Sequence, residues 1–216
     1  MCGRFTQYEP LEFFVEAVSG ALDDSLRYLL STQEQAPRYN ITPGTKIWTM
    51  AANPRGERVL RRQNWGFQAG RRMHINARRE SVHHTPSFEQ AFAAQRAVVL
   101  ANGFYEPKGP KSSKNRPWYY FEHADGAPLF LVAIYNAHGI AILTQAPTGP
   151  VADIHDRSPV FMPPHHVNTW LTDPTPSKEL LDQLTSPTIA QHLRYHPVSD
   201  AAKSPKNEGK SLIEPI

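Results

Sequence analysis

The stretches AVVLANGFYE at residues 97–106 and LFLVAIY at residues 129–135 decide the expected fold. Both are nearly continuous apolar runs, which are typical of strands buried on both faces. Between them, RPWYYFEH at residues 116–123 mixes polar and aromatic residues, as a half-exposed strand does. Strands are therefore predicted at residues 46–52, 59–67, 97–106, 118–122, 128–135 and 140–145.

Helical periodicity occurs only in short segments, at residues 11–18, 25–30, 87–95 and 177–184. Ser87, with Gln90 three residues later, is expected to cap the third of these helices. The 20 prolines and 12 glycines divide the chain into short pieces, which favours strands over long helices. We expect one α+β domain over residues 1–216, with a mostly antiparallel, barrel-like or sandwich sheet and peripheral helices. The C-terminal LIEPI is expected to return to the sheet.

Length and composition exclude several classes of protein. The chain of 216 residues can bury a core, and its 40% hydrophobic and 20% charged residues are a globular composition, not a fibrous or disordered one. No window approaches the roughly 18 to 20 consecutive apolar residues of a membrane span. The N-terminus MCGRFTQYEP has no apolar signal core. We therefore expect a soluble, cytoplasmic protein that does not enter a membrane.

Positive charge is concentrated in one region of the chain. The whole chain has 23 Lys and Arg against 20 Asp and Glu, a net charge of +3, but residues 51–80 contain eight arginines and two glutamates. Such a basic stripe can bind phosphates, and it can also be a solvated face of strands and loops. A second basic group is expected at a loop tip and contains Lys108, Lys111, Lys114 and Arg116.

The single cysteine, Cys2, has the most informative position in the chain. One cysteine excludes an internal disulfide, and the ten histidines lack the spacing of a metal site, so no metal or organic cofactor is expected. If Met1 is removed, the chain begins with an α-amine and a thiol on one residue. The amine can condense with an aldehyde near neutral pH, and the thiol can then add to the imine and close a thiazolidine ring. The alternative is that Cys2 is a small buried hydrophobe.

Other segments place polar groups where packing alone would not require them. In INARRE at residues 75–80, Asn76, Arg78 and Glu80 share one face if the chain is extended. The structural alternative is an exposed edge or loop with a local Arg–Glu pair. Glu106 ends a buried-looking strand, where partial burial would raise its pKa and suit it to proton transfer. A plain surface glutamate is the other interpretation.

His155 lies in VADIHDRSP, flanked by Asp153, Asp156 and Arg157. With an ordinary pKa near 6.5, it can act as an acid or a base at neutral pH. A turn histidine bonded to a neighbouring aspartate is the structural alternative, and the local sequence does not choose between the two.

Seven motifs follow one another along nearly the whole chain: MCGRF at 1–5, RYNITPGT at 38–45, WGF at 65–67, INARRE at 75–80, ANGFYEPK at 101–108, IHDRSPV at 154–160, and HPVS with KNEG at 196–209. In this order they resemble the SOS response-associated peptidase (SRAP) family, the abasic-site processing proteins. The resemblance implies a single α+β domain around a β-barrel-like core. It also implies that the N-terminal cysteine, here Cys2 after loss of Met1, captures the ring-opened sugar aldehyde of an abasic site in single-stranded DNA as a thiazolidine.

The resemblance further assigns roles to residues of the expected catalytic set. Cys2 forms the covalent bond, and Asn76 bonds the opened sugar or the nascent linkage. Glu106 acts as acid and base during imine formation. His155 assists ring opening and the reversal of the crosslink.

The expected DNA-binding residues come from the same resemblance. Arg4 and Arg78 match positions that hold phosphates next to the lesion, and Pro43 matches a residue that lies against the DNA at a kink. Trp65 belongs to the WGF motif of this surface, and Thr144 matches a threonine near the reactive terminus. The expected partner is single-stranded DNA with abasic sites, bound by a monomer.

One departure from the family pattern concerns base stacking. After Phe67, many relatives carry a proline and one or two tryptophans that stack on bases, whereas this chain reads QAGRRMH. Because a stacked base contributes about 1–3 kcal/mol, weaker DNA affinity is expected unless Arg71, Arg72 or His74 compensates.

Two other classes of function are compatible with the residues. In an N-terminal-nucleophile hydrolase, Cys2 would attack an amide with its own amine as the base. In a noncatalytic single-strand binding module, the basic stripe and the aromatic residues would suffice. An abasic-site lyase side activity is also expected, because an imine at C1′ acidifies the C2′ proton and permits β-elimination.

Overall fold

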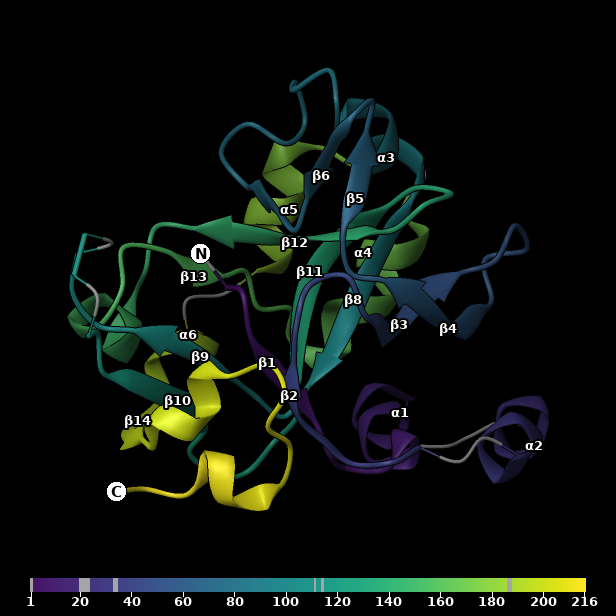
Figure 1. The fold of residues 1–216 in the computed structure, drawn as a ribbon. Coiled ribbons are helices and arrows are strands. Elements are labelled where there is room, and N and C mark those ends of the chain that lie inside the picture. Colours follow the sequence, from purple (N-terminus) through teal and green to yellow (C-terminus); the bar gives the residue numbers. More distant parts are fainter. Residues whose placement is uncertain (1, 20–23, 33–34, 111, 114, 186–187) are drawn as a thin grey trace.

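The computed structural model describes residues 2–19, 24–32, 35–110, 112–113, 115–185 and 188–216. Its strands form a larger sheet, a smaller sheet and a hairpin (Figure 1). The larger sheet contains, in spatial order, β13 (Ser158–Pro159), β12 (Ile140–Gln145), β11 (Leu129–Tyr135), β8 (Arg96–Ala101), β3 (Lys46–Ala52) and β4 (Arg58–Asn64), with β7 (Asn76–Arg78) paired to β12. The smaller sheet contains β14 (Leu193–Val198), β10 (Trp118–His123), β9 (Gly103–Pro107), β1 (Phe5–Gln7) and β2 (Arg38–Ile41), and the hairpin is β5 (Phe67–Ala69) with β6 (Arg72–His74).

Short helices surround the sheets. The α-helices are α1 (Leu11–Ser19), α2 (Asp24–Thr32), α3 (Glu89–Ala94), α4 (Val167–Thr172), α5 (Lys178–Leu184) and α6 (Thr188–Gln191). The 3-10 helices are η1 (Gly149–Asp153), η2 (Pro164–His166), η3 (Asp200–Lys203) and η4 (Lys210–Ile213). Among the described residues, no helix combines the length and apolar character needed to span a bilayer.

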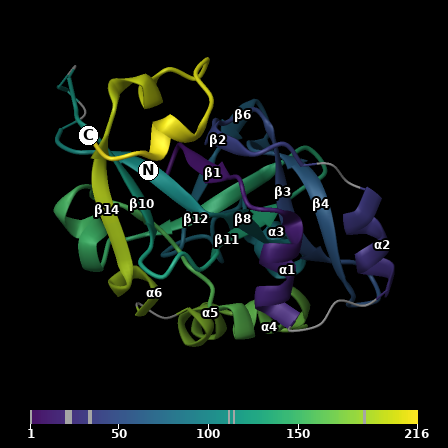
Figure 2. The same ribbon diagram turned by 90° about the horizontal axis from the view of Figure 1, so that it is seen from below.

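Apolar clusters order the molecule into layers. Successive residues of a strand face opposite sides of a sheet, so Val98 and Leu100 of β8 pack toward the helices, whereas Val99 and Ala101 pack toward the smaller sheet. Figure 2 shows helices α4 and α5 and the C-terminal segment on opposite sides of the molecule, with strands between them. The prediction that the apolar runs form strands buried on both faces is confirmed.

The predicted strand 97–106 is instead two strands in two sheets. The chain leaves the larger sheet at Asn102, whose Oδ1 accepts hydrogen bonds from the backbone N–H groups of Tyr8 (2.7 Å) and Glu9 (3.3 Å). It then enters the smaller sheet at Gly103, where a Cβ would lie 2.3 Å from the Tyr120 hydroxyl oxygen. The prediction of one strand was wrong, because side-chain anchoring and close packing turn the chain at these two residues.

The predicted strand 59–67 is also interrupted. Strand β4 ends at Asn64, and Gly66 adopts a φ of 151°, a conformation that favours glycine. A Cβ at Gly66 would lie 2.6 Å from the Met73 sulfur, so the β5–β6 hairpin packs directly on this glycine. The interruption lets the chain after Trp65 turn into the hairpin.

The helix predictions are confirmed in position, but the one capping prediction is not. Ser177 caps α5 by accepting a hydrogen bond from the Leu180 N–H at 3.0 Å. Ser87 does not cap α3, because Phe88 is the N-cap and its N–H, like that of Glu89, bonds to the Thr85 carbonyl. The capping prediction for Ser87 was therefore wrong.

The architecture is the expected mixture of helices and mostly antiparallel strands. Among the described strands, β7 pairs in parallel with β12. In the part of the chain that the structure describes, both sheets are open, so the barrel-like core is not a closed barrel. The C-terminal LIEPI returns to the smaller sheet through a bridge between Val198 and Pro215, as expected. Lys108 and Arg116 lie in the expected loop between β9 and β10, whereas Lys111 and Lys114 lie outside the described residues.

Candidate active site

Cys2 lies between the two sheets at the start of β1. Strand β1 pairs with β9 on one side and β2 on the other, so the residues that lead into it are held firmly. Cys2 is fully buried in the apolar cluster between the sheets, and its carbonyl oxygen accepts a hydrogen bond from Asn76 Nδ2 at 2.9 Å. The burial expected for a small hydrophobe is therefore present, but polar groups lie beside it.

Asn76 reaches Cys2 from the opposite sheet. Asn76 begins β7, where it is in register with Ile142 of β12. Its amide nitrogen donates a hydrogen bond to the Cys2 carbonyl. None of the described residues donates a hydrogen bond to its buried Oδ1 atom. A buried amide oxygen without a donor is unfavourable, so this atom is well suited to accept a hydrogen bond from a bound molecule.

Glu106 and His155 complete this group. Glu106 lies near the end of β9 with 1% of its surface exposed, and its Oε2 is 3.5 Å from Nε2 of the buried His155 side chain. Burial raises the pKa of Glu106 to about 7, so this carboxyl exchanges its proton near neutral pH. Burial, and secondarily the Glu106 charge, raise the pKa of the Cys2 thiol well above its ordinary value. The expected burial and raised pKa of Glu106 are confirmed.

The second nitrogen of His155 faces a tight turn. Its Nδ1 lies 3.1 Å from Asp156 Oδ1 and 3.1 Å from both the backbone nitrogen and the carbonyl oxygen of Arg157. The structural interpretation of His155 from sequence is therefore confirmed, and its role as an acid or a base stays a prediction. His155 is a turn histidine beside an aspartate, and its other nitrogen faces a buried carboxyl. We call Cys2, Asn76, Glu106 and His155 the reactive cluster.

Two surface hollows are lined by members of the reactive cluster. The first, of about 210 Å³, is lined by Gly3, Arg4, Tyr105, Glu106, Pro107, Arg116, Trp118 and His155. The second, of about 290 Å³, is lined by Asn76, Ala77, Arg78, Ser81, Thr85, Phe88, Thr144, Asp156 and Arg157. Each hollow contains part of the cluster together with arginines, an arrangement suited to an anionic ligand.

The expected DNA-binding residues are placed very differently from one another. Arg78 is exposed beside Asn76, and no hydrogen bond or ion pair joins its side chain to the other described residues. Pro43 is half-buried in the turn between β2 and β3. Both positions are compatible with contact to a bound strand.

The burial of Trp65 corrects the expectation that its ring lies at the DNA surface, and Thr144 is also buried. The Trp65 ring is fully buried, donates from Nε1 to the Ile75 carbonyl at 2.9 Å, and packs edge-on against Phe5. Thr144 is 2% exposed, and its hydroxyl accepts a hydrogen bond from Arg157 at 3.3 Å. Packing before the hairpin buries Trp65 completely, whereas Thr144, on β12, still lines the second hollow.

Arg4 is also turned toward the protein. Its Nη1 donates to Asn40 Oδ1 (2.5 Å) and the Ala202 carbonyl (3.1 Å), and Nη2 donates to the Lys203 carbonyl (3.5 Å). Asn40 Nδ2 donates in turn to the carbonyls of Ser204 (2.9 Å) and Asn207 (2.8 Å). We call Arg4, Asn40 and these carbonyls the C-terminal lock, because they fasten the last segment of the chain to β1 and β2.

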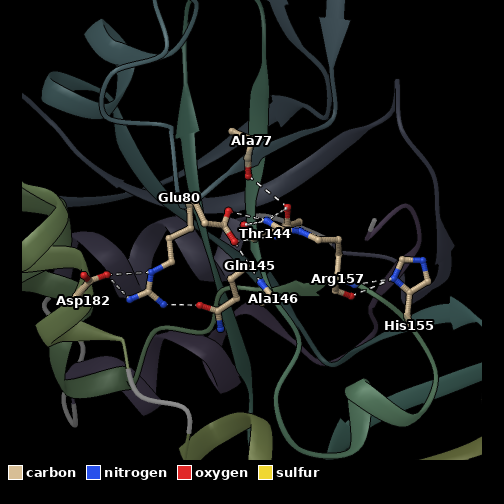
Figure 3. A network of polar contacts seen from close by, with 9 residues as sticks. Ala77, Glu80, Thr144, Gln145, Ala146, His155, Arg157 and Asp182 are labelled. Carbon is tan, nitrogen blue, oxygen red and sulfur yellow. Dashed lines mark hydrogen bonds and ion pairs between the residues drawn. The ribbon is translucent and has the colours of Figure 1, made fainter.

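Sequence reasoning missed the long-range partner of Glu80. The expected alternative was a local pair with a neighbouring arginine, but Glu80 binds Arg157, 77 residues away, through contacts of 2.7 and 2.9 Å (Figure 3). Arg79, from the basic stripe, pairs with Asp182 at 2.8 Å. Glu80 lies in the INARRE motif and Arg157 in the IHDRSPV motif. Nothing in either motif indicates that the two side chains meet.

Within the described ranges, no group of three His, Cys, Asp or Glu side chains is arranged to hold a metal ion. The chemistry that this geometry offers is that of a buried thiol, a carboxyl and an imidazole.

The model of the family "SOS response associated peptidase (SRAP)" matches residues 1–205. The chain is 31% identical to the abasic site processing protein YedK of Escherichia coli, over all of both chains, and 28% identical to the abasic site processing protein YoqW of Bacillus subtilis, over 99% of each. A crystal structure of a phage-related protein from Bordetella bronchiseptica superposes with a TM-score of 0.76 at 28% identity, covering 92% of this chain and 95% of that one. A Bacteroides thetaiotaomicron protein superposes with the same TM-score at 17% identity over all of both chains, which shows the fold alone.

Proposed function

Since the chain belongs to the SOS response associated peptidase (SRAP) family, we propose that it processes abasic sites in single-stranded DNA by capturing them covalently on Cys2. The observation that carries the proposal is the reactive cluster. It brings a buried thiol, a carboxyl with a pKa of about 7 and an imidazole together beside the N-terminus. The names of the relatives YedK and YoqW supply the substrate.

The capture consists of two bond-forming steps and releases one water. After removal of Met1, the Cys2 α-amine adds to C1′ of the ring-opened sugar aldehyde, and loss of water gives an imine. The Cys2 sulfur then adds to C1′ while its proton passes to the nitrogen, which closes the thiazolidine. Because burial raises the thiol pKa, the sulfur keeps its proton until this closure.

The other members of the cluster move protons and hold the sugar. Glu106 protonates the departing hydroxyl of the carbinolamine, a task for which a pKa of about 7 is suitable. Asn76 fixes the Cys2 main chain and offers its Oδ1 to a sugar hydroxyl. His155, through Glu106, assists opening of the sugar ring and reversal of the crosslink.

DNA binding before capture depends on groups around the cluster. Arg78 holds a phosphate next to the lesion, and Pro43 lies against the strand. Arg4 contributes by fastening the start of β1, because its guanidinium is engaged by the C-terminal lock. Binding through phosphates supplies affinity, whereas the covalent step supplies specificity for the lesion.

A lyase side reaction follows from the imine intermediate. The imine acidifies the C2′ proton, so β-elimination of the 3′ phosphate competes with ring closure by the thiol. Closure removes the imine and thereby protects the strand. A variant that retains the amine but lacks the thiol should therefore cleave abasic DNA more than the wild type does.

The test compares wild type and Cys2→Ala on a single strand with one abasic site. The wild type should form a product that resists SDS, and Cys2→Ala should form none except after borohydride, while retaining noncovalent binding. An intact strand and a peptide amide serve as control substrates. A stable product with Cys2→Ala, or an acyl-enzyme with the amide, would contradict the proposal, the latter in favour of an N-terminal-nucleophile hydrolase.

A further inference from the structure

Arg157 joins separate segments of the fold beside the reactive cluster. Its guanidinium binds both carboxylate oxygens of Glu80 at 2.7 and 2.9 Å, and it donates to the Thr144 carbonyl at 2.5 Å (Figure 3). Glu80 also accepts a hydrogen bond from the Ala146 N–H at 3.3 Å. The turn after β7 and the end of β12 are therefore tied to the turn that carries His155.

The main chain of Arg157 faces His155 Nδ1 with both a donor and an acceptor. The backbone nitrogen and the carbonyl oxygen of Arg157 each lie 3.1 Å from Nδ1. When Nδ1 carries no proton, it accepts from the backbone N–H. When Nδ1 carries a proton, it donates to the carbonyl or to Asp156 Oδ1, which is also 3.1 Å away.

This arrangement supports both neutral tautomers of His155 and the cation. In one tautomer, Nε2–H points toward the Glu106 carboxylate, 3.5 Å away. In the other, the Nε2 lone pair faces the protonated carboxyl of Glu106. A proton can therefore pass between Glu106 and His155 without loss of the Nδ1 partner, provided that the main chain of residues 155–157 stays where it is.

We propose that Glu80 and Arg157 are a positioning pair, which holds the 155–157 turn so that His155 and Glu106 exchange protons during release of the captured abasic site. Neither side chain contacts the reacting atoms. The inference rests on the proposed function, because release is a step of that reaction. Release breaks the C1′–S bond with proton delivery to sulfur, adds one water to the imine carbon, and breaks the C1′–N bond to return the aldehyde and the amine.

A second ion pair in the same network provides a matched control. Arg79, in the same turn after β7, binds Asp182 at 2.8 Å, and Asp182 also pairs with Lys178 at 2.6 Å. Among the described residues, neither Arg79 nor Asp182 forms a hydrogen bond or ion pair with residues 155–157. Both acids are partly exposed, at 49% for Glu80 and 41% for Asp182. Replacing either acid therefore removes one surface carboxylate, and only replacement of Glu80 loosens Arg157.

The experiment measures release from preformed crosslinks, a first-order rate that does not depend on DNA affinity. Glu80→Gln, Glu80→Ala, Glu80→Asp, Asp182→Asn and His155→Ala are each crosslinked to an abasic single strand. Free protein is then trapped with excess unlabelled abasic DNA. Noncovalent affinity for an intact strand and the melting temperature are measured in parallel.

We expect Glu80→Ala and Glu80→Gln to slow release about tenfold, because misplaced groups commonly lose one to two orders of magnitude in rate. Glu80→Asp should recover part of the rate, and Asp182→Asn should stay within about twofold of wild type. DNA affinity should be unchanged or higher in the Glu80 variants, because a carboxylate has been removed near a polyanion. If Glu80 acted only through its charge, its replacement would change the noncovalent affinity for DNA and leave the release rate unchanged.

Two outcomes would overturn the inference in distinguishable ways. If Glu80→Gln and Glu80→Ala release the strand at the wild-type rate while His155→Ala is slow, the positioning role is wrong and the proposed function stands. If Asp182→Asn slows release as much as Glu80→Gln, the effect is not specific to the 155–157 turn, and the role is also wrong. If the wild type forms no crosslink, the proposed function fails and the inference falls with it.

Discussion

The C-terminal lock and the reactive cluster are neighbours at the start of β1, but their polar groups find different kinds of partner. In the lock, Arg4 and Asn40 donate to main-chain carbonyls of the C-terminal segment, which are neutral and do not titrate. In the cluster, Glu106 faces His155 and Cys2, all of which titrate. Similar polar side chains therefore stabilise the fold on one side and hold exchangeable protons on the other.

Mutations in the C-terminal lock and in the reactive cluster should therefore have different effects. Loss of a residue from the lock should lower stability and leave the chemistry of folded protein intact. Loss of a residue from the cluster should slow or abolish a chemical step and leave stability unchanged or increased.

Glu106→Gln should slow crosslink formation by about a hundredfold or more, because general acid–base catalysis commonly contributes two to four orders of magnitude. The rate is measured by quenching reactions with an abasic single strand at saturating protein. Glu122→Gln is the matched control, since Glu122 lies on the adjacent strand β10 and forms a surface ion pair with Arg194. Equal rates for Glu106→Gln and wild type would remove Glu106 from the mechanism.

The same Glu106→Gln variant should be more stable than wild type at alkaline pH. The folded pKa of Glu106, about 7, lies above its ordinary 4.5, so the folded state binds more protons between these values. The contribution of Glu106 to the free energy of unfolding therefore falls as pH rises from about 4.5 to 7, by up to about 3 kcal/mol. Denaturation at pH 5 and pH 8 should show a higher free energy of unfolding for the variant than for wild type only at pH 8. An equal difference between variant and wild type at both pH values would contradict the raised pKa of Glu106.

Asn40→Ala should lower the free energy of unfolding by about 2 kcal/mol, because it leaves buried partners of the C-terminal lock without hydrogen bonds. Urea denaturation measures this loss. Crosslinking by the folded variant, well below its melting temperature, should stay within about twofold of wild type. If crosslinking disappears while the fold persists, the lock belongs to the reactive site and the division fails.

Arg78→Ala should have the smallest effect, a few-fold loss of noncovalent affinity for single-stranded DNA. The slope of log affinity against log salt should decrease by about 0.7, as for the loss of one phosphate contact. Arg79→Ala should change the slope less, because Arg79 is already paired with Asp182. Identical slopes for Arg78→Ala and wild type would show that Arg78 does not bind a phosphate.

The large apolar strands could be predicted from sequence, and the short strands could not. Strand β3 at Lys46–Ala52 and strand β11 follow the predicted bounds closely, because their apolar side chains are buried on both faces. Strand β1 has three residues and β7 has three, and each is held by neighbours distant in sequence. Such pairing leaves little local pattern to detect.

The candidate site shows the same division between local and long-range information. The raised pKa of Glu106 could be predicted because it follows a buried strand. The inward orientation of Arg4 could not, because the carbonyls that it binds in the C-terminal segment lie about 200 residues later in the chain. Trp65 was expected at the DNA surface from its motif, but Gly66 turns the chain so that the tryptophan packs between the sheets.

The most direct test of the central claim is the intact mass of the purified protein, alone and after incubation with a short single strand that contains one abasic site. The account predicts a starting mass without Met1 and an adduct equal to protein plus oligonucleotide minus one water. The adduct should not react with iodoacetamide, because the only cysteine of the chain is closed in the ring. A protein that lacks Met1 but forms no adduct, or an adduct whose thiol can still be alkylated, would contradict thiazolidine capture by Cys2.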